Sequence, residues 1–217
     1  ILGNSPGSDI PMYAEKVEGY RNFVNKLWNI SRFVLSKIDD VHYVENCPEA
    51  NILSDKWLFA KLNELKENYF IQMDKYNLSV AGEALRIFTG DFFADWYLEI
   101  AKVEGGKDEI LLYVLRNLLQ LWHPFIPFVT EVIWENFETE KLLMISVFDK
   151  FEKGNNSEAM YKDFELLQNV VSSIRNIKNE YKVTNYDLVV SYKTEKSKLI
   201  EENKEIIIQL SKIKELN

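Results

Sequence analysis

The sequence predicts a mainly α protein, in which a helical bundle is followed by a small C-terminal α/β appendage. Three observations lead to this fold class. Apolar residues recur at helical spacing in five successive segments, glycine or proline separates several of them, and two short, partly β-branched runs follow residue 140. With 47% hydrophobic and 13% aromatic residues, the 217-residue chain has enough apolar side chain for a packed core.

The five predicted helices of the bundle follow one another between residues 15 and 137. The first covers 15–36, where six side chains share one arc of the helical wheel: Tyr20, Phe23, Val24, Leu27, Ser31 and Val34. The second covers 55–73, with Ser54 as its expected N-cap. The third covers 79–102 and ends before Gly105 and Gly106; the fourth covers 108–122 and ends before Pro124. The fifth covers 127–137, with Pro127 in its first turn.

The chain changes character after residue 140. We expect a strand at 142–148, a linker at 152–158, a long helix at 159–182, a second strand at 187–192 and a last helix at 196–210. The predicted division is therefore a helical bundle at 1–140 and a small α/β subdomain at 141–217.

Several classes of protein do not fit this sequence. No run of about 18 apolar residues occurs, so no membrane span is predicted. The single cysteine, Cys47, cannot form an internal disulfide, which fits a reducing cytoplasm. The first ten residues lack a Met and a signal-peptide pattern, and they indicate a segment of a longer protein. Phosphate-binding glycine loops, nucleophile-elbow motifs and metal-ligand spacings around the two histidines are also missing from the sequence, so we expect no catalytic residues and no metal site.

One row of carboxylates leaves two interpretations open. Asp91, Asp95 and Glu99 are spaced by four and share one helix face, which is compatible with a metal or acid–base site. More often such a row is solvated, or it pairs with Lys and Arg on a neighbouring helix. The second interpretation is favoured.

The first helix carries a polar stripe beside its apolar arc. Arg21, Asn25, Trp28 and Arg32 lie within about 60° of one another on the wheel, and Asn29 extends the row. Guanidinium and aromatic planes stack on unpaired bases, and amides bond to base edges, so the stripe suggests RNA binding. The alternative is that Trp28 belongs to the core and that Arg21 pairs with Glu18. The total charge of −8 argues against nucleic acid, but residues 15–37 contain five bases and two acids.

Three segments in order resemble the valyl-tRNA synthetase family: "KVEGYRNFVNKLWNISRFVL" (16–35), "DFFADWYLEIAK" (91–102) and "LWHPFIPFVTEVIW" (121–134). Residues 174–183 and 198–216 are similar to the segment that follows the anticodon domain in that family. One departure is Gly90, where the family commonly has a bulky aromatic residue. A mid-helix glycine costs about 1 kcal/mol relative to alanine, so we expect a groove or kink there.

The resemblance implies a helical anticodon-binding domain of a multidomain ligase. Its implied partners are the anticodon stem-loop of tRNA(Val), of which the middle A and last C are read, and the catalytic and editing domains of the same polypeptide. ATP and Mg would bind in the catalytic domain, so this chain alone is expected to be non-catalytic, cytoplasmic and monomeric. The residues expected to contact tRNA are those of the stripe and two from the following loop: Arg21, Asn25, Trp28, Asn29, Arg32, His42 and Tyr43.

Two alternatives remain open from the sequence. One is the anticodon domain of an isoleucyl- or leucyl-tRNA synthetase, because the His-Pro-Phe run is loosely shared among these families. The other is a helical protein–protein interaction module without RNA binding, which the net acidic charge favours and the Arg/Asn/Trp stripe disfavours.

Overall fold

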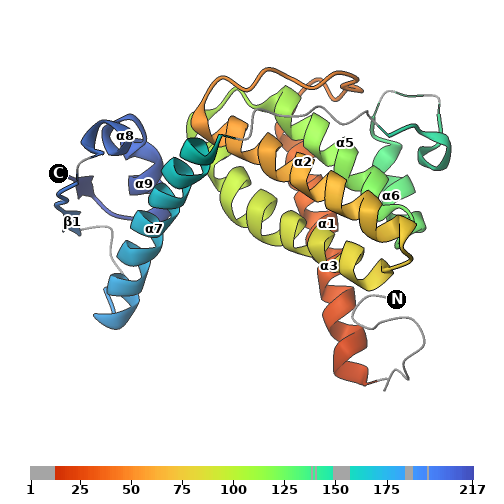
Figure 1. Cartoon of the computed structure of the whole chain (residues 1–217), viewed down its shortest axis with the longest axis horizontal. Coiled ribbons are helices and arrows are strands. Elements are labelled where there is room, and N and C mark those ends of the chain that lie inside the picture. Colours follow the sequence, from red (N-terminus) through yellow and green to blue (C-terminus); the bar gives the residue numbers. More distant parts are fainter. Residues whose placement is uncertain (1–12, 138, 140, 149–156, 184–187, 195) are drawn as a thin grey trace.

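The computed structural model of the chain describes residues 13–137, 139, 141–148, 157–183, 188–194 and 196–217. It is a helical bundle with a smaller helical appendage at its side (Figure 1). The elements of the bundle are α1 (Ala14–Lys37), α2 (Leu53–Asp74), α3 (Leu78–Ile87), the π-helical segment η1 (Phe88–Tyr97), α4 (Leu98–Glu104), α5 (Asp108–Trp122) and α6 (Pro127–Trp134). The predicted mainly α class is confirmed. No helix among the described residues is long and apolar enough to cross a membrane.

Helix α5 is the centre of the bundle. Every side chain from Ile110 to Trp122 is buried, including the polar side chains of Arg116, Asn117 and Gln120. Buried polar groups on α5 bond to the surrounding elements: Asn117 accepts from Lys66 of α2 at 2.9 Å, and the indole of Trp122 donates to Thr89 of η1 at 3.0 Å. These bonds fix α2 and η1 around α5.

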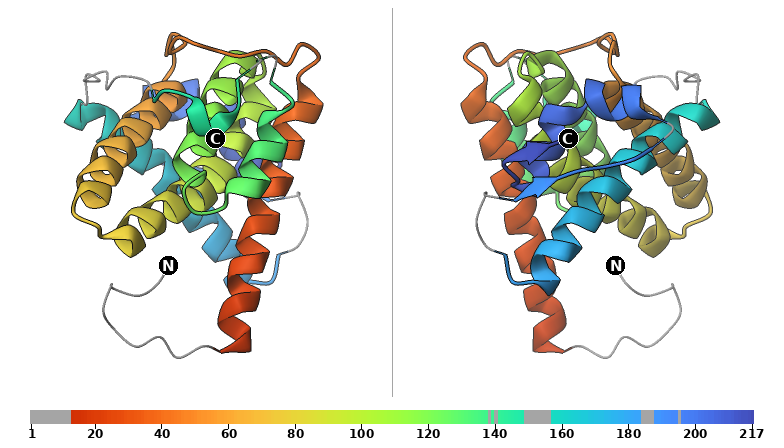
Figure 2. Two further views of the ribbon diagram at one scale, coloured as in Figure 1. Left: turned by 90° about the vertical axis from the view of Figure 1, so that its right-hand side faces the viewer. Right: turned by 90° about the vertical axis from the view of Figure 1, so that its left-hand side faces the viewer.

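Helix α1 crosses the bundle and extends beyond the other helices at its N-terminal end (Figures 1 and 2). Its buried side comprises Leu27, Ile30, Ser31 and Val34, while Tyr20, Phe23 and Val24 are half-buried. Because α1 packs against α5, η1 and α6, its remaining side chains lie near two different neighbours.

The segment from α3 to α4 is one continuous helical run interrupted by a π-helical stretch. Gly90 lies in that stretch, and a Cβ added there would come within 3.3 Å of the Lys26 ammonium of α1. Lys26 therefore occupies the space that a larger side chain would take. The run ends at Gly105, whose φ of +66° favours glycine.

A buried polar cluster fixes the junction of α4 and α5 against α2. The Lys107 ammonium bonds to Asp55 at 2.8 Å, and the Tyr97 hydroxyl donates to the same carboxylate at 2.7 Å. Ser54 bonds to Glu104, so it is not the side-chain cap of α2 that the sequence predicts. Burial raises the pKa of the Glu104 carboxyl. Removing one member of such a cluster would leave a buried charge unpaired, which is strongly destabilising. Movement of η1 or α4 away from α2 would break the same bonds, so the cluster holds both segments in one position.

The predicted strand at 142–148 is wrong. Residues Leu143–Ile145 form a single 3-10 turn (η2) with extended residues on both sides. Side chains of neighbouring helices satisfy the backbone instead of a second strand: Glu131 accepts from the Leu143 N–H at 2.8 Å, and Gln120 donates to the Val147 carbonyl at 3.0 Å. Partly β-branched composition alone does not supply a pairing partner.

The appendage comprises α7 (Glu158–Glu180), β1 (Val189–Val190), α8 (Ser197–Glu202), α9 (Lys204–Ser211) and β2 (Glu215–Leu216). β1 and β2 pair in parallel, and the predicted last helix is broken at Asn203. Most of the expected linker at 152–158 lies outside the described residues. Phe164 stacks on Trp57 of α2 with ring centroids 4.0 Å apart, so appendage and bundle share one core cluster. The domain boundary at 140 stays a prediction.

Candidate nucleic-acid interface

The polar stripe of α1 is on the surface. Trp28 is 43% exposed, so it is not a core residue, and the four other members are exposed. Arg21 forms an ion pair with Glu18 at 3.2 Å, as the alternative interpretation of the stripe predicted. Both side chains are largely exposed, and a pair of this kind contributes about 0.2–1 kcal/mol, so the guanidinium is readily available to another anion.

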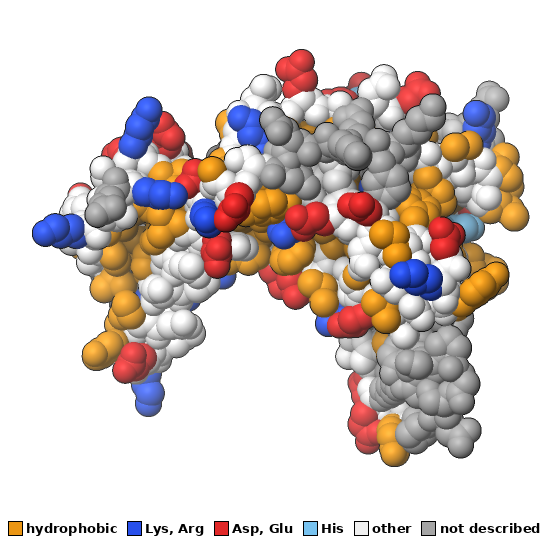
Figure 3. Space-filling view, viewed as in Figure 1, with side chains coloured by type: hydrophobic (Ala, Val, Ile, Leu, Met, Phe, Trp, Pro, Cys, Tyr) orange, Lys and Arg blue, Asp and Glu red, His pale blue; other side chains and the backbone are white. Residues whose placement is uncertain are grey.

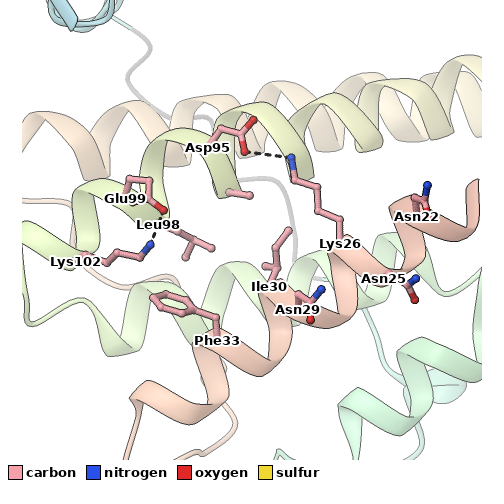
Figure 4. Close-up of a pocket in the computed structure, with 11 residues that line it drawn as sticks. Asn22, Asn25, Lys26, Asn29, Ile30, Phe33, Asp95, Leu98, Glu99 and Lys102 are labelled. Atoms are coloured by element: carbon pink, nitrogen blue, oxygen red, sulfur yellow. Dashed lines mark hydrogen bonds and ion pairs between the residues drawn. The ribbon is translucent and has the colours of Figure 1, made fainter. Parts of the chain in front are cut away.

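A groove of about 460 Å³ lies between α1 and the η1–α4 segment. We call it the α1–α4 groove. Figure 4 shows Asn22, Asn25 and Asn29 along its α1 side, and Asp95, Glu99 and Lys102 on the opposite side. The floor between them is apolar and consists mainly of Ile30, Phe33 and Leu98. Amides on one rim and charges on the other, over an apolar floor, match the edges and face of a planar base.

Two lysines of the α1–α4 groove are held by the predicted carboxylate row. The Lys26 ammonium lies 3.1 Å from Asp95 and 3.4 Å from the Gly90 carbonyl, and Lys102 pairs with Glu99. The interpretation of the row as a partner for lysine on a neighbouring helix is therefore confirmed for Asp95, whereas Glu99 pairs with a lysine of its own helix. Among the described residues, no three His, Cys, Asp or Glu side chains are arranged to hold a metal ion.

Phe33 provides the aromatic surface of the groove. Its ring packs against the core, and the ammonium groups of Lys37 and Lys102 lie 5.4 and 4.9 Å from its centroid. Both ammonium groups lie over the ring, so an unpaired base can stack on it only after they move toward a phosphate.

A second hollow, of about 310 Å³, lies on the other side of α1. Trp28 and Arg32 line it from α1, and Ile133 and Asn136 line it from α6 and the turn that follows. The stripe is thus divided: Asn25 and Asn29 border the α1–α4 groove, whereas Trp28 and Arg32 border the hollow toward α6.

The two loop residues predicted to contact tRNA are bound to the fold. The His42 ring lies between the Asp40 carbonyl (2.9 Å from Nδ1) and the Glu109 carboxylate (2.9 Å from Nε2). Two acceptors favour the doubly protonated ring, so they raise the pKa of His42, the Asp40 carbonyl most strongly. The Tyr43 hydroxyl accepts from the fully buried Arg116 at 3.0 Å.

The loop that carries these residues, 38–52, runs across one end of the bundle (Figure 2). Arg116 also donates to the Glu45 carbonyl at 3.3 Å, and the Tyr43 ring meets Trp134 edge-to-face at 5.8 Å. Neither His42 nor Tyr43 lines the α1–α4 groove.

Sequence reasoning predicted Asn25 and Asn29 of the groove but missed Asn22, Lys26 and Phe33. Asn22, Lys26, Asn29 and Phe33 are spaced by four, three and four, the same spacing as the stripe but shifted by one residue. That second row was the available signal. Lys102, on the far wall, gives no such signal, because only the fold brings it beside Phe33.

Two comparisons with known proteins show the family of the chain. Residues 55–212 match the family described as the anticodon-binding domain of tRNA ligase. The chain is 39% identical to a valine–tRNA ligase of Bacillus cereus, in an alignment that covers 82% of this chain and 22% of the relative. It is 38% identical to that of Listeria monocytogenes (82% and 21%) and 35% identical to that of Carboxydothermus hydrogenoformans (84% and 22%). The chain thus spans about a fifth of the length of these relatives, and it belongs to the family of anticodon-binding domains of tRNA ligases.

Proposed function

We propose that the chain is the anticodon-binding domain of a valine–tRNA ligase and that it binds the anticodon stem-loop of tRNA(Val). The observation that carries this proposal is the α1–α4 groove, in which amides, lysines and an aromatic ring surround a space suited to an unpaired base. The family match and the names of the relatives support it. The domain acts by binding in a monomeric, cytoplasmic ligase, while ATP and Mg²⁺ serve the joining reaction in another domain.

In the α1–α4 groove, a splayed anticodon base stacks on Phe33 and meets the amides of Asn25 and Asn29 at its edge. Each amide offers both a donor and an acceptor, so it suits a base edge. Lys26 and Lys102 exchange their carboxylate partners for phosphate. That exchange costs little, because both ion pairs are substantially exposed.

On the other side of α1, Arg21 and Arg32 contact the phosphates of the loop, and Trp28 packs against the backbone beside them. His42 supplies a further cation near the end of α1. We assign Tyr43 to positioning of the 38–52 loop, because its hydroxyl is bonded to Arg116. The acceptor end of the tRNA is thereby fixed for an active site elsewhere in the ligase.

A titration with tRNA(Val) tests the proposal. The chain is titrated with native tRNA(Val) and with tRNA(Val) altered at the middle A or the last C of the anticodon, at two salt concentrations. Binding weakens with salt, because cations replace counterions on the phosphates. Asn29→Ala lowers affinity for the native tRNA about fivefold, the value of one hydrogen bond near 1 kcal/mol. Arg32→Ala and Arg21→Ala weaken binding to all three tRNAs alike.

The matched control is Asn176→Ala, which removes an exposed amide from helix α7, outside the lining of the groove. It leaves affinity unchanged. Equal binding of native and altered anticodons would contradict anticodon recognition, and tighter binding of tRNA(Ile) or tRNA(Leu) would reassign the ligase. No binding of any tRNA at low salt would favour the protein–protein module.

A further inference from the structure

The two rims of the α1–α4 groove carry different hydrogen-bonding groups. Asn22, Asn25 and Asn29 line the α1 rim, and none of their side-chain amides bonds to another of the described residues. Asp95 lies on the opposite rim, where Lys26 donates to its Oδ1 at 3.1 Å. Within the described part of the chain, the second carboxylate oxygen, Oδ2, has no hydrogen-bond donor. The groove therefore presents available amides on one side and an available acceptor on the other.

This difference between the rims favours some bases over others. An ionised carboxylate only accepts hydrogen bonds, whereas an amide both donates and accepts. Cytosine and adenine each carry an exocyclic amino group, which is a donor, where uracil and guanine carry a carbonyl oxygen, which is an acceptor. A base in the groove that turns its amino group toward η1 gains a hydrogen bond to the carboxylate. A carbonyl oxygen in the same place faces another acceptor and is repelled.

Of the two carboxylates on this rim, Asp95 is the one held from across the groove. Its partner Lys26 belongs to α1 and also donates to the Gly90 carbonyl at 3.4 Å, in the space that a side chain at Gly90 would narrow. Glu99 pairs instead with Lys102 of its own helix, so nothing in that pair links the two walls. A carboxylate that is already held loses less conformational freedom when a base binds, so Asp95 is the better placed acceptor.

The charges around the groove give base contacts a large share of the selectivity. The lining itself contains two lysines and two acids, so its formal charges cancel. Figure 3 shows acidic and basic side chains interspersed over the bundle on the face that it draws. Attraction of phosphate to such a surface is weaker than to a basic patch, and it does not depend on base identity. Discrimination between bases must therefore come from groups that meet their edges.

We propose that Asp95 is a specificity-determining residue, whose carboxylate accepts a hydrogen bond from the exocyclic amino group of the anticodon base in the α1–α4 groove. The groove then selects adenine or cytosine over guanine or uracil. This inference rests on the proposed function, which stacks that base on Phe33. If Lys26 stays, Oδ2 is available to the base, and if Lys26 moves to a phosphate, both oxygens are. The middle A and the last C of the anticodon both carry such an amino group, and the test below distinguishes them.

Removal of single amino groups from the anticodon tests the proposal. The full-length ligase is titrated with synthetic tRNA(Val) in which the middle A is replaced by unsubstituted purine, or the last C by pyrimidin-2-one. Each replacement keeps the ring and loses the exocyclic amino group. Wild type binds one of these two tRNAs about tenfold more weakly than the native tRNA, which corresponds to roughly 1.4 kcal/mol, and this identifies the base in the groove. Asp95→Ala removes the difference, because the acceptor is gone. Lys26→Gln weakens binding of all three tRNAs alike and keeps the difference.

The matched control is Asp91→Ala, which removes an exposed carboxylate from the same segment, η1, but outside the lining of the groove. It keeps the tenfold difference, and so does Glu99→Ala. Equal binding of the native and both altered tRNAs by wild type would overturn the proposal. So would a difference that survives Asp95→Ala, or one that Glu99→Ala abolishes instead. If wild type still prefers the native anticodon over ordinary base changes in any of these cases, the proposed function stands and only the role of Asp95 fails.

Discussion

The two flanks of helix α1 carry different kinds of side chains. Toward η1 and α4 lie three amides, two paired lysines and an aromatic floor. Toward α6 lie Trp28 and Arg32, and beyond them an aliphatic surface with acidic neighbours. We propose that the first flank takes an unpaired nucleotide and that the second takes the edge of a loop backbone.

The difference shows that neighbouring positions of one helix serve different surfaces. Asn29 borders the α1–α4 groove, while Trp28, one residue earlier, borders the hollow toward α6. Likewise Phe33 faces the groove and Arg32 faces α6. A helical wheel places all four on the exposed half, but the elements packed on each side decide what each can bind.

The largest expected effect is on the free energy of unfolding, because both flanks depend on the buried side of α1. Leu27 is fully buried on α1 between them. Leu27→Ala removes core packing and leaves a cavity, so the free energy of unfolding falls by about 2–5 kcal/mol in urea denaturation. Val17→Ala, on the exposed start of α1, changes it by less than about 0.5 kcal/mol. Equal effects of the two would mean that α1 is not held by its core side.

The next largest effect is on the affinity for tRNA(Val), which we expect to differ between substitutions on the two flanks. Phe33→Leu keeps an apolar side chain in the groove floor but removes the ring, and we expect a loss of about 1–3 kcal/mol in binding of tRNA(Val), the value of one stacked base. Trp28→Leu costs less, because Trp28 lies on the other flank. Fluorescence titration of both variants measures this. A greater loss for Trp28→Leu would move base recognition to the α6 side.

Most of the fold was predictable because helical periodicity and breakers are local signals. The stretch 108–122 is mostly apolar with helical periodicity, and it is the buried centre of the bundle. The strand at 142–148 failed because pairing is not local: Glu131 and Gln120 satisfy that backbone from other helices. The break at Asn203 and the short partner strand β2 also depend on tertiary packing.

The candidate site was only partly predictable for the same reason. Spacing placed Arg21 and Asn29 on the surface of α1, as the structure shows. Spacing does not reveal that Lys26 fills the space beside Gly90, or that Lys102 approaches Phe33 from a segment about 70 residues away along the chain. Whether these residues contact tRNA stays a prediction.

A smaller effect is expected on the salt dependence of tRNA binding. Lys102→Gln removes one cation from the α1–α4 groove, so the slope of log affinity against log salt decreases in magnitude by about 0.7 for a single-stranded loop. Lys162→Gln is the matched control, since Lys162 is also ion-paired on an exposed helix face, but on α7. Binding measured at several salt concentrations gives both slopes. An unchanged slope for Lys102→Gln would mean that no phosphate reaches that wall.

The smallest expected effect tests whether His42 belongs to the fold or to RNA binding. Its pKa is raised in the folded chain, so its ionic contribution to stability is fully present below the unfolded pKa near 6.5 and is lost as pH rises through the folded value. Because the His42–Glu109 pair is partly exposed, wild type should lose only about 0.2–1 kcal/mol more than Glu109→Gln between about pH 6 and pH 8. Urea denaturation at the two pH values measures this difference. Parallel loss in both proteins would show that Glu109 does not hold His42, and would leave its ring available to phosphate.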